Sequence, residues 1–199
     1  MKGLICDLRK LVKTYKEKEF DIEFYIISGG LKEIIIGCEY IRENFKCIYG
    51  SELAGDNENS VLKYIKRAVT FTEKTRFLFE INKGITSEET IEKPYAVNKF
   101  VESRERRIPW PNFIYIGDGQ TDIPCFSLIK ANGGSPFLVF DPSDEQSAKR
   151  TFLEFLKPQR VLSVHAPKYR KKDDLGSLIR TAVSTRCNNI IIEEASGHR

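Results

Sequence analysis

Two carboxylates four residues apart follow a short apolar run. They are Asp118 and Asp122, in Phe113-Ile-Tyr-Ile-Gly-Asp-Gly-Gln-Thr-Asp122. Ligands of open α/β sheets bind beyond the carboxyl ends of the strands, and a glycine-flanked turn there would leave its carboxylates exposed. Two such carboxylates suit Mg²⁺, which prefers oxygen ligands. The alternative is an Asp-Gly turn in which Asp118 hydrogen-bonds its own backbone, and these residues alone do not separate the two interpretations.

A small hydroxyl residue and two glycines follow another apolar run, in Phe24-Tyr-Ile-Ile-Ser-Gly-Gly30. The Ser28 hydroxyl and neighbouring backbone N–H groups, that of Gly29 among them, can hold phosphate oxygens at such a strand end. A helix N-cap or an ordinary strand-to-helix turn explains the same residues. Without further context, we favour this second interpretation.

A lysine follows a threonine at the start of a helical pattern, in Thr70-Phe-Thr-Glu-Lys74. The helix dipole disfavours a cation at this end, so an anion or a carboxylate would have to hold Lys74. A surface lysine is the simpler interpretation, because the chain has many.

Short apolar runs alternate with segments of helical period, which predicts an α/β layer fold with a parallel sheet and helices on both faces. Helices are expected over 31–45, 71–83, 124–132 and 175–183, and another after a Ser143/Gln146 capping box. Residues 61–70 predict a short hairpin or an irregular excursion, and 85–111 a polar helix or loop. The strands are expected at Glu23–Ile27, Cys47–Tyr49, Phe113–Ile116, Phe137–Phe140 and Arg160–Val164.

The three segments with candidate site residues follow one another along the chain in a fixed order. The strand with Ser28-Gly29 comes first, Lys74 follows Ser28 by 46 residues, and Asp118 of the Gly-Asp-Gly-x-x-Asp turn follows Lys74 by 44 residues. This resembles the second, third and fourth motifs of the haloacid dehalogenase (HAD) superfamily of hydrolases. The chain resembles the phosphoserine phosphatase-like branch of this superfamily over roughly residues 1–185, and the amino-acid sequences of three segments are the most similar. These segments are 71–84, Arg106-Arg-Ile-Pro109 and Tyr115-Ile-Gly-Asp-Gly-Gln-Thr-Asp-Ile-Pro-Cys125.

The resemblance implies a Rossmann-like core and a Mg²⁺-dependent phosphatase. Ser28 and Gly29 would bind the phosphoryl group, and Lys74 would neutralise its charge. Asp118 would ligate Mg²⁺, with Asp122 as a second ligand or as the partner that orients Lys74. Positioning and charge neutralisation do most of the work in phosphoryl transfer. The expected substrate is a small phosphomonoester of unspecified identity.

The first motif of the family, Asp-x-Asp-x-Thr/Val after a strand, occurs nowhere in the sequence. Its first aspartate is the nucleophile and its second the general acid and base. The early candidate, Asp7, lies in a segment whose apolar positions follow a helix. We therefore expect a chain that begins inside a longer protein and is inactive and marginally stable alone, because the missing strand is central in the family's sheet. The expected organisation is the end of a cap or linking helix over 1–22, a core over 23–187 with an excursion at 52–71, and a tail over 188–199.

The composition fits one ordinary soluble domain, with 41% hydrophobic and 30% charged residues in 199. No apolar run approaches the roughly 20 residues that cross a bilayer, and we expect a cytoplasmic protein without a membrane partner. The five cysteines form no Cys-x-x-Cys pair, which favours reduced, mostly buried thiols.

A net charge of +4 is mild, and Lys168, Arg170, Lys171 and Lys172 are interpreted as solvated surface, so no nucleic-acid partner is expected. The sequence leaves the oligomeric state open.

Two other functions stay open beside the phosphatase. One is a non-enzymatic relic or regulatory domain that keeps the phosphate and metal contacts. The other is an unrelated Rossmann-like nucleotide-binding module, which the absence of Gly-x-Gly-x-x-Gly and Gly-x-x-x-x-Gly-Lys-Ser/Thr loops disfavours.

Overall fold

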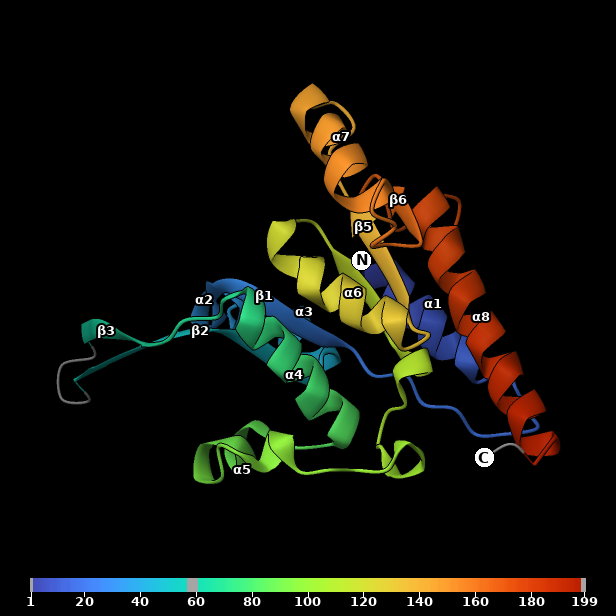
Figure 1. Ribbon diagram of the computed structural model, residues 1–199, viewed down its shortest axis with the longest axis horizontal. Helices are drawn as coiled ribbons and strands as arrows, with labels where there is room; N and C mark the ends of the chain where they lie inside the picture. Colours follow the sequence, from blue (N-terminus) through green and yellow to red (C-terminus); the bar gives the residue numbers. More distant parts are fainter. Residues whose placement is uncertain (1, 57–60, 198–199) are drawn as a thin grey trace. The chain divides into compact units, whose positions relative to one another are not determined.

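The computed structural model of the chain describes residues 2–56 and 61–197. The chain divides into two compact units, one of residues Glu23–Phe77 and one of Met1–Ile22 with Leu78–Arg199. The expected core over 23–187 is therefore divided between two units, and helix α4 (Phe71–Lys83) begins in one and ends in the other. Both units are of the mixed α/β class and contain parallel strand pairs (Figure 1).

The unit of residues 23–77 contains a three-stranded sheet in the order β1-β2-β3. Strand β1 pairs with β2 in parallel, and β2 pairs with β3 in an antiparallel hairpin, the first alternative for residues 61–70. The helix expected over 31–45 is broken after Ile36 into two short helices, because Gly37 ends the first of them. The elements are β1 (Tyr25–Leu31), α2 (Lys32–Ile36), α3 (Glu39–Asn44), β2 (Cys47–Asp56), β3 (Val61–Arg67) and the start of α4.

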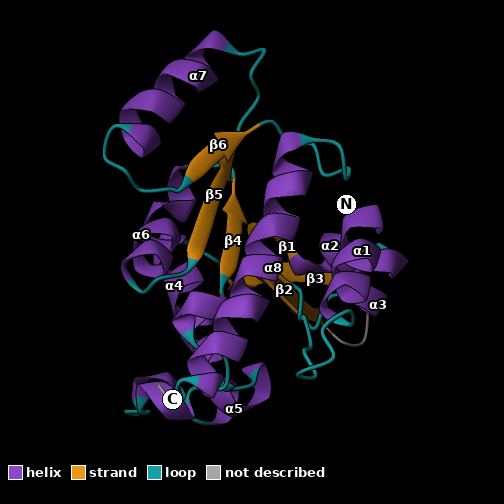
Figure 2. Cartoon of the chain, turned by 90° about the vertical axis from the view of Figure 1, so that its right-hand side faces the viewer, coloured by secondary structure: helices purple, strands orange, loops and turns teal. Residues whose placement is uncertain are grey.

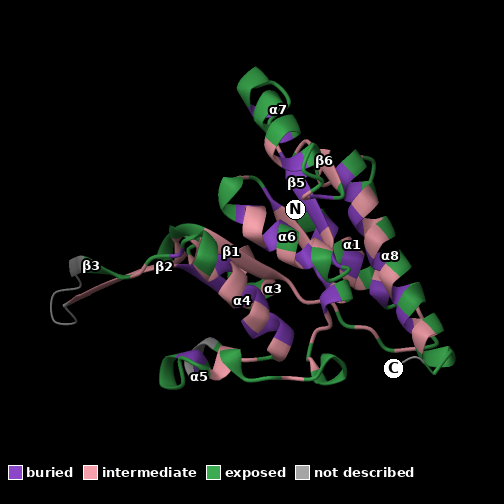
Figure 3. Ribbon diagram, in the orientation of Figure 1, coloured by how far each residue is buried: buried purple, intermediate pink, exposed green. Residues whose placement is uncertain are grey.

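The other unit contains a parallel sheet in the order β4-β5-β6. Helix α6 lies on one face of this sheet and α8 on the other, with α1 beside α8 (Figures 1 and 2). The buried residues of the unit gather along β5 and the inward sides of these helices (Figure 3). The main elements are α1 (Lys2–Val12), β4 (Ile114–Gly117), α6 (Ile123–Ala131), β5 (Ser135–Val139), α7 (Glu145–Thr151), a π-helical turn (Phe152–Leu156), β6 (Ser163–His165) and α8 (Asp174–Ala195).

Each expected strand overlaps an observed one, but β1 continues through Ser28 to Leu31 and β2 continues to Asp56. Most expected helices are confirmed, and three further differences remain. The N-cap of α7 is Asp144, whose carboxylate accepts the Gln146 N–H at 3.0 Å, so the Ser143 capping box is wrong. Helix α8 continues to Ala195, so most of the expected tail over 188–199 is helical; residues 198–199 lie outside the described residues. The excursion predicted over 52–71 is the β2–β3 hairpin, of which 57–60 also lie outside the described residues.

The polar segment 85–111 forms the short helix α5 (Ser87–Glu92) and three 3₁₀ turns, Ala96–Asn98, Ser103–Glu105 and Trp110–Asn112. Asn82 at the end of α4 anchors it. Its amide donates to the Ile108 carbonyl at 2.7 Å, and its oxygen accepts from Arg106. Asn82 is fully buried, so this pair of bonds fixes where the segment returns to the core.

The N-terminal helix predicted from the apolar positions of residues 4–15 is confirmed as α1. Leu4, Ile5 and Leu8 are buried, and Asp7, the early acidic candidate, forms an ion pair with Arg180 of α8 at 2.5 Å. Asp7 therefore contributes to the packing of two helices. The cysteines are all free thiols, but only Cys125 and Cys187 are buried, so the expectation of mostly buried thiols is wrong. No helix among the described residues is long and apolar enough to cross a membrane.

Candidate functional site

The two aspartates of the turn after β4 differ in their exposure to solvent. Strand β4 ends at Gly117, and a 3₁₀ turn over Gln120–Asp122 leads into α6. Asp118 is exposed, whereas only 3% of Asp122 is accessible to solvent. Asp118 is therefore the carboxylate that a ligand can reach.

Asp122 holds the turn in shape. One carboxylate oxygen accepts the Tyr115 hydroxyl at 2.7 Å, and the other accepts the backbone N–H groups of Asp118 at 3.1 Å and Gly119 at 3.3 Å. The backbone-binding carboxylate of this turn is thus Asp122, not Asp118 as the Asp-Gly alternative has it. These bonds give Asp122 a positioning role, and its ligation of a metal stays a prediction.

The cation site predicted here would rest on few protein ligands. The described residues contain no cluster of three or more histidine, cysteine, aspartate or glutamate side chains that could hold a metal ion. One exposed carboxylate still fits Mg²⁺, since this ion keeps several waters and is often held by one or two carboxylates together with phosphate oxygens. Asp118 is the residue of this unit that would hold it.

Tyr115 stabilises the turn through its hydrogen bond to Asp122. Burial raises the pKa of its phenol far above the ordinary range, and Cys125 and the Asp122 carboxylate raise it further. The neutral phenol is therefore the form that the folded chain stabilises, and it donates to Asp122.

We expect Tyr115→Phe to lower the free energy of unfolding by about 1–3 kcal/mol at neutral pH, because a buried carboxylate oxygen loses its donor. Above the unfolded-state tyrosine pKa of about 10, the wild type should lose stability with rising pH, since the unfolded state alone releases this proton. The variant should lose less there. Urea unfolding between pH 7 and pH 11 measures both, and equal pH slopes would contradict the assignment.

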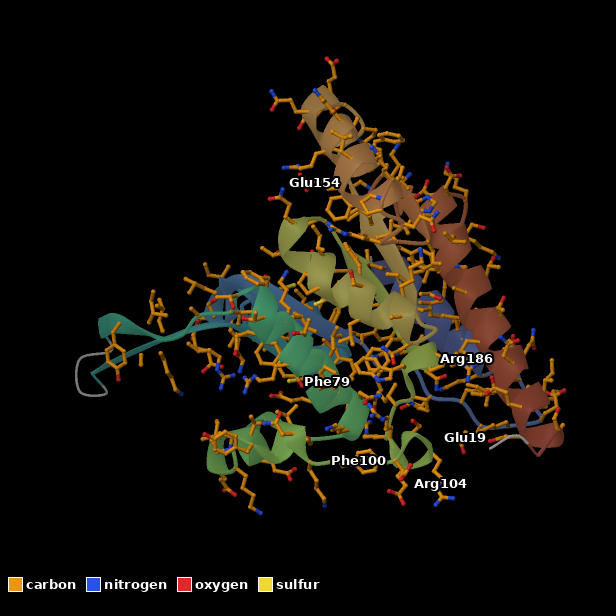
Figure 4. The ribbon with its side chains drawn as sticks, viewed as in Figure 1. Glu19, Phe79, Phe100, Arg104, Glu154 and Arg186 are labelled. Carbon is orange, nitrogen blue, oxygen red and sulfur yellow. The ribbon has the colours of Figure 1, made fainter. Side chains whose placement is uncertain are left out.

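The sequence did not point to the contact between the turn and the π-helical turn after α7. The Gln120 amide donates to both carboxylate oxygens of Glu154, at 2.9 and 2.8 Å. Glu154 is labelled in Figure 4. No periodicity could predict this pair, because a π-helical turn shifts its side chains off the helical repeat. The contact adds a second support to the turn that carries Asp118.

In the other unit, Ser28 lies in the middle of β1 (Tyr25–Leu31), so its predicted position beyond the end of the strand is wrong. Its hydroxyl oxygen accepts the Gly30 N–H at 3.0 Å, and the β1–β2 register shifts between Ile27 and Leu31. Residue Leu31 is the N-cap of α2 and makes no side-chain cap bond. Ser28 is therefore not a helix cap but part of a local turn, and its hydroxyl proton remains available for an acceptor.

Ser51, which the sequence did not single out, connects this turn to the start of α4. Its hydroxyl donates to the Gly29 carbonyl at 2.9 Å and accepts the Val69 N–H at 3.1 Å. The contact is close, because a Cβ on Gly29 would lie 3.4 Å from the Val69 carbonyl oxygen. The segment that leads into Lys74 is thereby fixed to the Ser28 turn.

We expect Ser51→Ala to cost about 1 kcal/mol of stability, since two backbone groups lose their partner. The amide hydrogen of Val69 should exchange faster, while amides of α4 beyond its first turn should not. Ser51→Thr keeps the hydroxyl and is the matched control. Native-state hydrogen exchange measures the effect, and unchanged protection of the Val69 amide in Ser51→Ala would contradict the connection.

Lys74 lies in the first turn of α4 and is buried, with 7% of the residue accessible. The simpler interpretation as a surface lysine is therefore wrong. A buried lysine in this first turn is consistent with a side chain that serves a site. Ser28, Gly29 and Lys74 belong to the unit of residues 23–77, and Asp118 and Asp122 belong to the other unit.

No family model matches the chain, and no solved structure matches it. The chain is similar to an uncharacterized protein of Borreliella burgdorferi, with 30% identity over 169 residues. The aligned part is 76% of this chain and 55% of that protein, so the chain spans about half the length of the relative it matches. This similarity indicates no substrate, cofactor or partner.

Proposed function

We propose that the chain is the core of a Mg²⁺-dependent, phosphatase-type hydrolase of the HAD superfamily that acts on a small phosphomonoester. The observation that carries this is the turn after β4: an exposed Asp118 at the carboxyl end of a parallel strand, held by a buried Asp122. Such a turn presents one carboxylate to solvent at the sheet edge where α/β proteins bind ligands. A bound Mg²⁺ would there neutralise phosphoryl charge.

In the unit of residues 23–77, a separate group of residues would bind phosphate. The Ser28 hydroxyl and the Gly29 N–H would bind phosphoryl oxygens, and Lys74 would neutralise their charge. The Ser51 bridge supports this assignment, since it fixes the Ser28 turn to the segment that carries Lys74. A preorganised set of this kind is what phosphoryl transfer requires from a protein.

We further propose that this chain alone has no phosphatase turnover, because it contains no Asp-x-Asp nucleophile motif. Among the described residues, β1 and β4 are each an outer strand of their own sheet.

Phosphate binding tests the proposed class without requiring turnover. Titration calorimetry of the purified chain with inorganic phosphate should show binding that depends on Mg²⁺. Asp118→Asn should remove the Mg²⁺ dependence, and Ser28→Ala should weaken phosphate binding about tenfold, the equivalent of one charge-assisted hydrogen bond. Asp21→Asn, at another exposed aspartate, is the matched control and should bind as the wild type does.

Phosphate binding that is absent, or indifferent to Mg²⁺ and to Asp118, would contradict the class. Hydrolysis of p-nitrophenyl phosphate by the purified chain would contradict its inactivity. The missing motif also favours a second candidate, a non-enzymatic domain that binds phosphate and metal. The coding frame ahead of the Met1 codon separates the two: an in-frame Asp-x-Asp-x-Thr/Val after a strand supports the enzyme, and an adjacent stop codon supports the binding domain.

A further inference from the structure

The loop between β6 and α8, residues 166–173, leaves the sheet at the edge that also carries Asp118. Strands β4, β5 and β6 are parallel, and their register brings the ends of the three strands level. The segments that follow Gly117 and His165 therefore start at the same edge, about 10 Å apart at the usual strand spacing.

Tyr169 lies in this loop and is half-buried. Burial raises the pKa of its phenol, and the negative charge of Asp118 adds to this effect. The shared edge of the parallel sheet places the loop on the side of the unit that carries Asp118.

The backbone of the loop is fixed. The Arg170 N–H donates to the Asp173 carboxylate at 2.8 Å, and the Asp173 N–H donates back to the Arg170 carbonyl at 3.0 Å. Gly176 of α8 allows the loop to pack directly on the helix, because a Cβ there would lie 2.1 Å from the Arg170 carbonyl oxygen. A loop held in this way loses little conformational entropy when it binds a ligand.

The loop carries four exposed basic side chains against one carboxylate, that of Asp173. Lys168, Arg170, Lys171 and Lys172 are exposed, and none forms an ion pair with any residue that the structure describes. A solvated charge run needs no fixed backbone, whereas an anion-binding loop gains from one.

We propose that loop 166–173 binds a second anionic group, a phosphate or a carboxylate, of a ligand whose phosphoryl group lies at Asp118. This rests on the proposed function, which supplies the phosphoryl group. It narrows the substrate class to small organic phosphates that carry a second anionic group.

A pair of sugar phosphates tests the proposal on the whole chain. Titration calorimetry with Mg²⁺ at about 0.15 M ionic strength compares fructose 1,6-bisphosphate with fructose 6-phosphate. The wild type should bind the bisphosphate at least about tenfold more tightly. Replacing Lys168, Lys171 and Lys172 by Gln should abolish that preference. Replacing Lys10, Lys13 and Lys16 by Gln removes three other exposed lysines and should preserve it.

Equal affinity of the wild type for both sugars would overturn the proposal, as would a preference that survives in the loop variant. An equal loss in both triple variants would also overturn it, because general charge attraction would then explain the binding. If the proposed function itself is wrong, the result is distinguishable from failure of the loop proposal. In that case neither sugar phosphate would bind in a manner that depends on Mg²⁺ and Asp118. Binding of the monophosphate that Asp118→Asn abolishes, without a bisphosphate preference, would refute this proposal alone.

Discussion

Gly117→Ala is expected to destabilise the chain by about 3 kcal/mol and to displace Asp122. A Cβ at residue 117 would lie 2.7 Å from the Asp122 carboxylate and 2.8 Å from the ring of Phe126. Phe126 is fully buried and belongs to the core cluster with Leu138 and Phe155, so neither neighbour can move into solvent. Overpacking of a closed core costs about 1–3 kcal/mol, and the hydrogen bonds of Asp122 add to it.

Gly119→Ala is the control two residues away, since a Cβ there meets nothing within 4 Å. It should change stability by less than about 0.5 kcal/mol. Urea unfolding gives both values, and the amide hydrogens of Asp118 and Gly119 should exchange faster in Gly117→Ala, because both donate to Asp122. Equal stability of the two variants would show that the turn adapts to a side chain and that Asp122 does not hold it rigidly.

The strands were predictable because apolar runs bounded by glycine and proline are a local signal. The run Phe113–Ile116 and the glycine after it placed β4 and the Asp118 turn to within one residue. Helix ends were less predictable where two capping residues compete, as Ser143 and Asp144 do before α7. Asp144 caps the helix because its carboxylate reaches the Gln146 N–H, while Ser143 is engaged with Asp141.

The different roles of Asp118 and Asp122 were not predictable from the sequence, because they depend on contacts and burial that only the folded structure shows. Sequence reasoning gave Asp118 and Asp122 similar roles, but the Tyr115 hydroxyl and the burial of the turn separate them. Ser51 and Glu154 gave no signal at all, since each acts through one pair of bonds to a segment at least 18 residues away. The length of α8 was missed because the polar pair Asn188-Asn189 interrupts its apolar pattern.

Gly176→Ala is expected to have the largest effect of the Gly→Ala substitutions for which the structure describes the surroundings of the glycine. The Cβ would lie 2.1 Å from the Arg170 oxygen and 2.8 Å from the Tyr169 carbonyl carbon. Both are backbone atoms of the loop that Asp173 holds in place, so the whole loop would have to move. We expect a loss of about 4 kcal/mol in unfolding free energy, against a gain of at most about 1 kcal/mol in helix propensity.

The control is Gly3→Ala in α1, another helical glycine, whose Cβ would meet nothing within 4 Å. It should leave stability unchanged or raise it by up to about 1 kcal/mol. In Gly176→Ala the pKa of Tyr169 should fall back toward the ordinary value for tyrosine, because the displaced ring becomes solvated and leaves the Asp118 carboxylate. NMR titration of labelled tyrosines, assigned with Tyr169→Phe, measures this. A destabilised variant that keeps the raised Tyr169 pKa would mean that α8 shifts while the loop stays at Asp118, and the loop would then owe its position to the sheet edge and not to the helix.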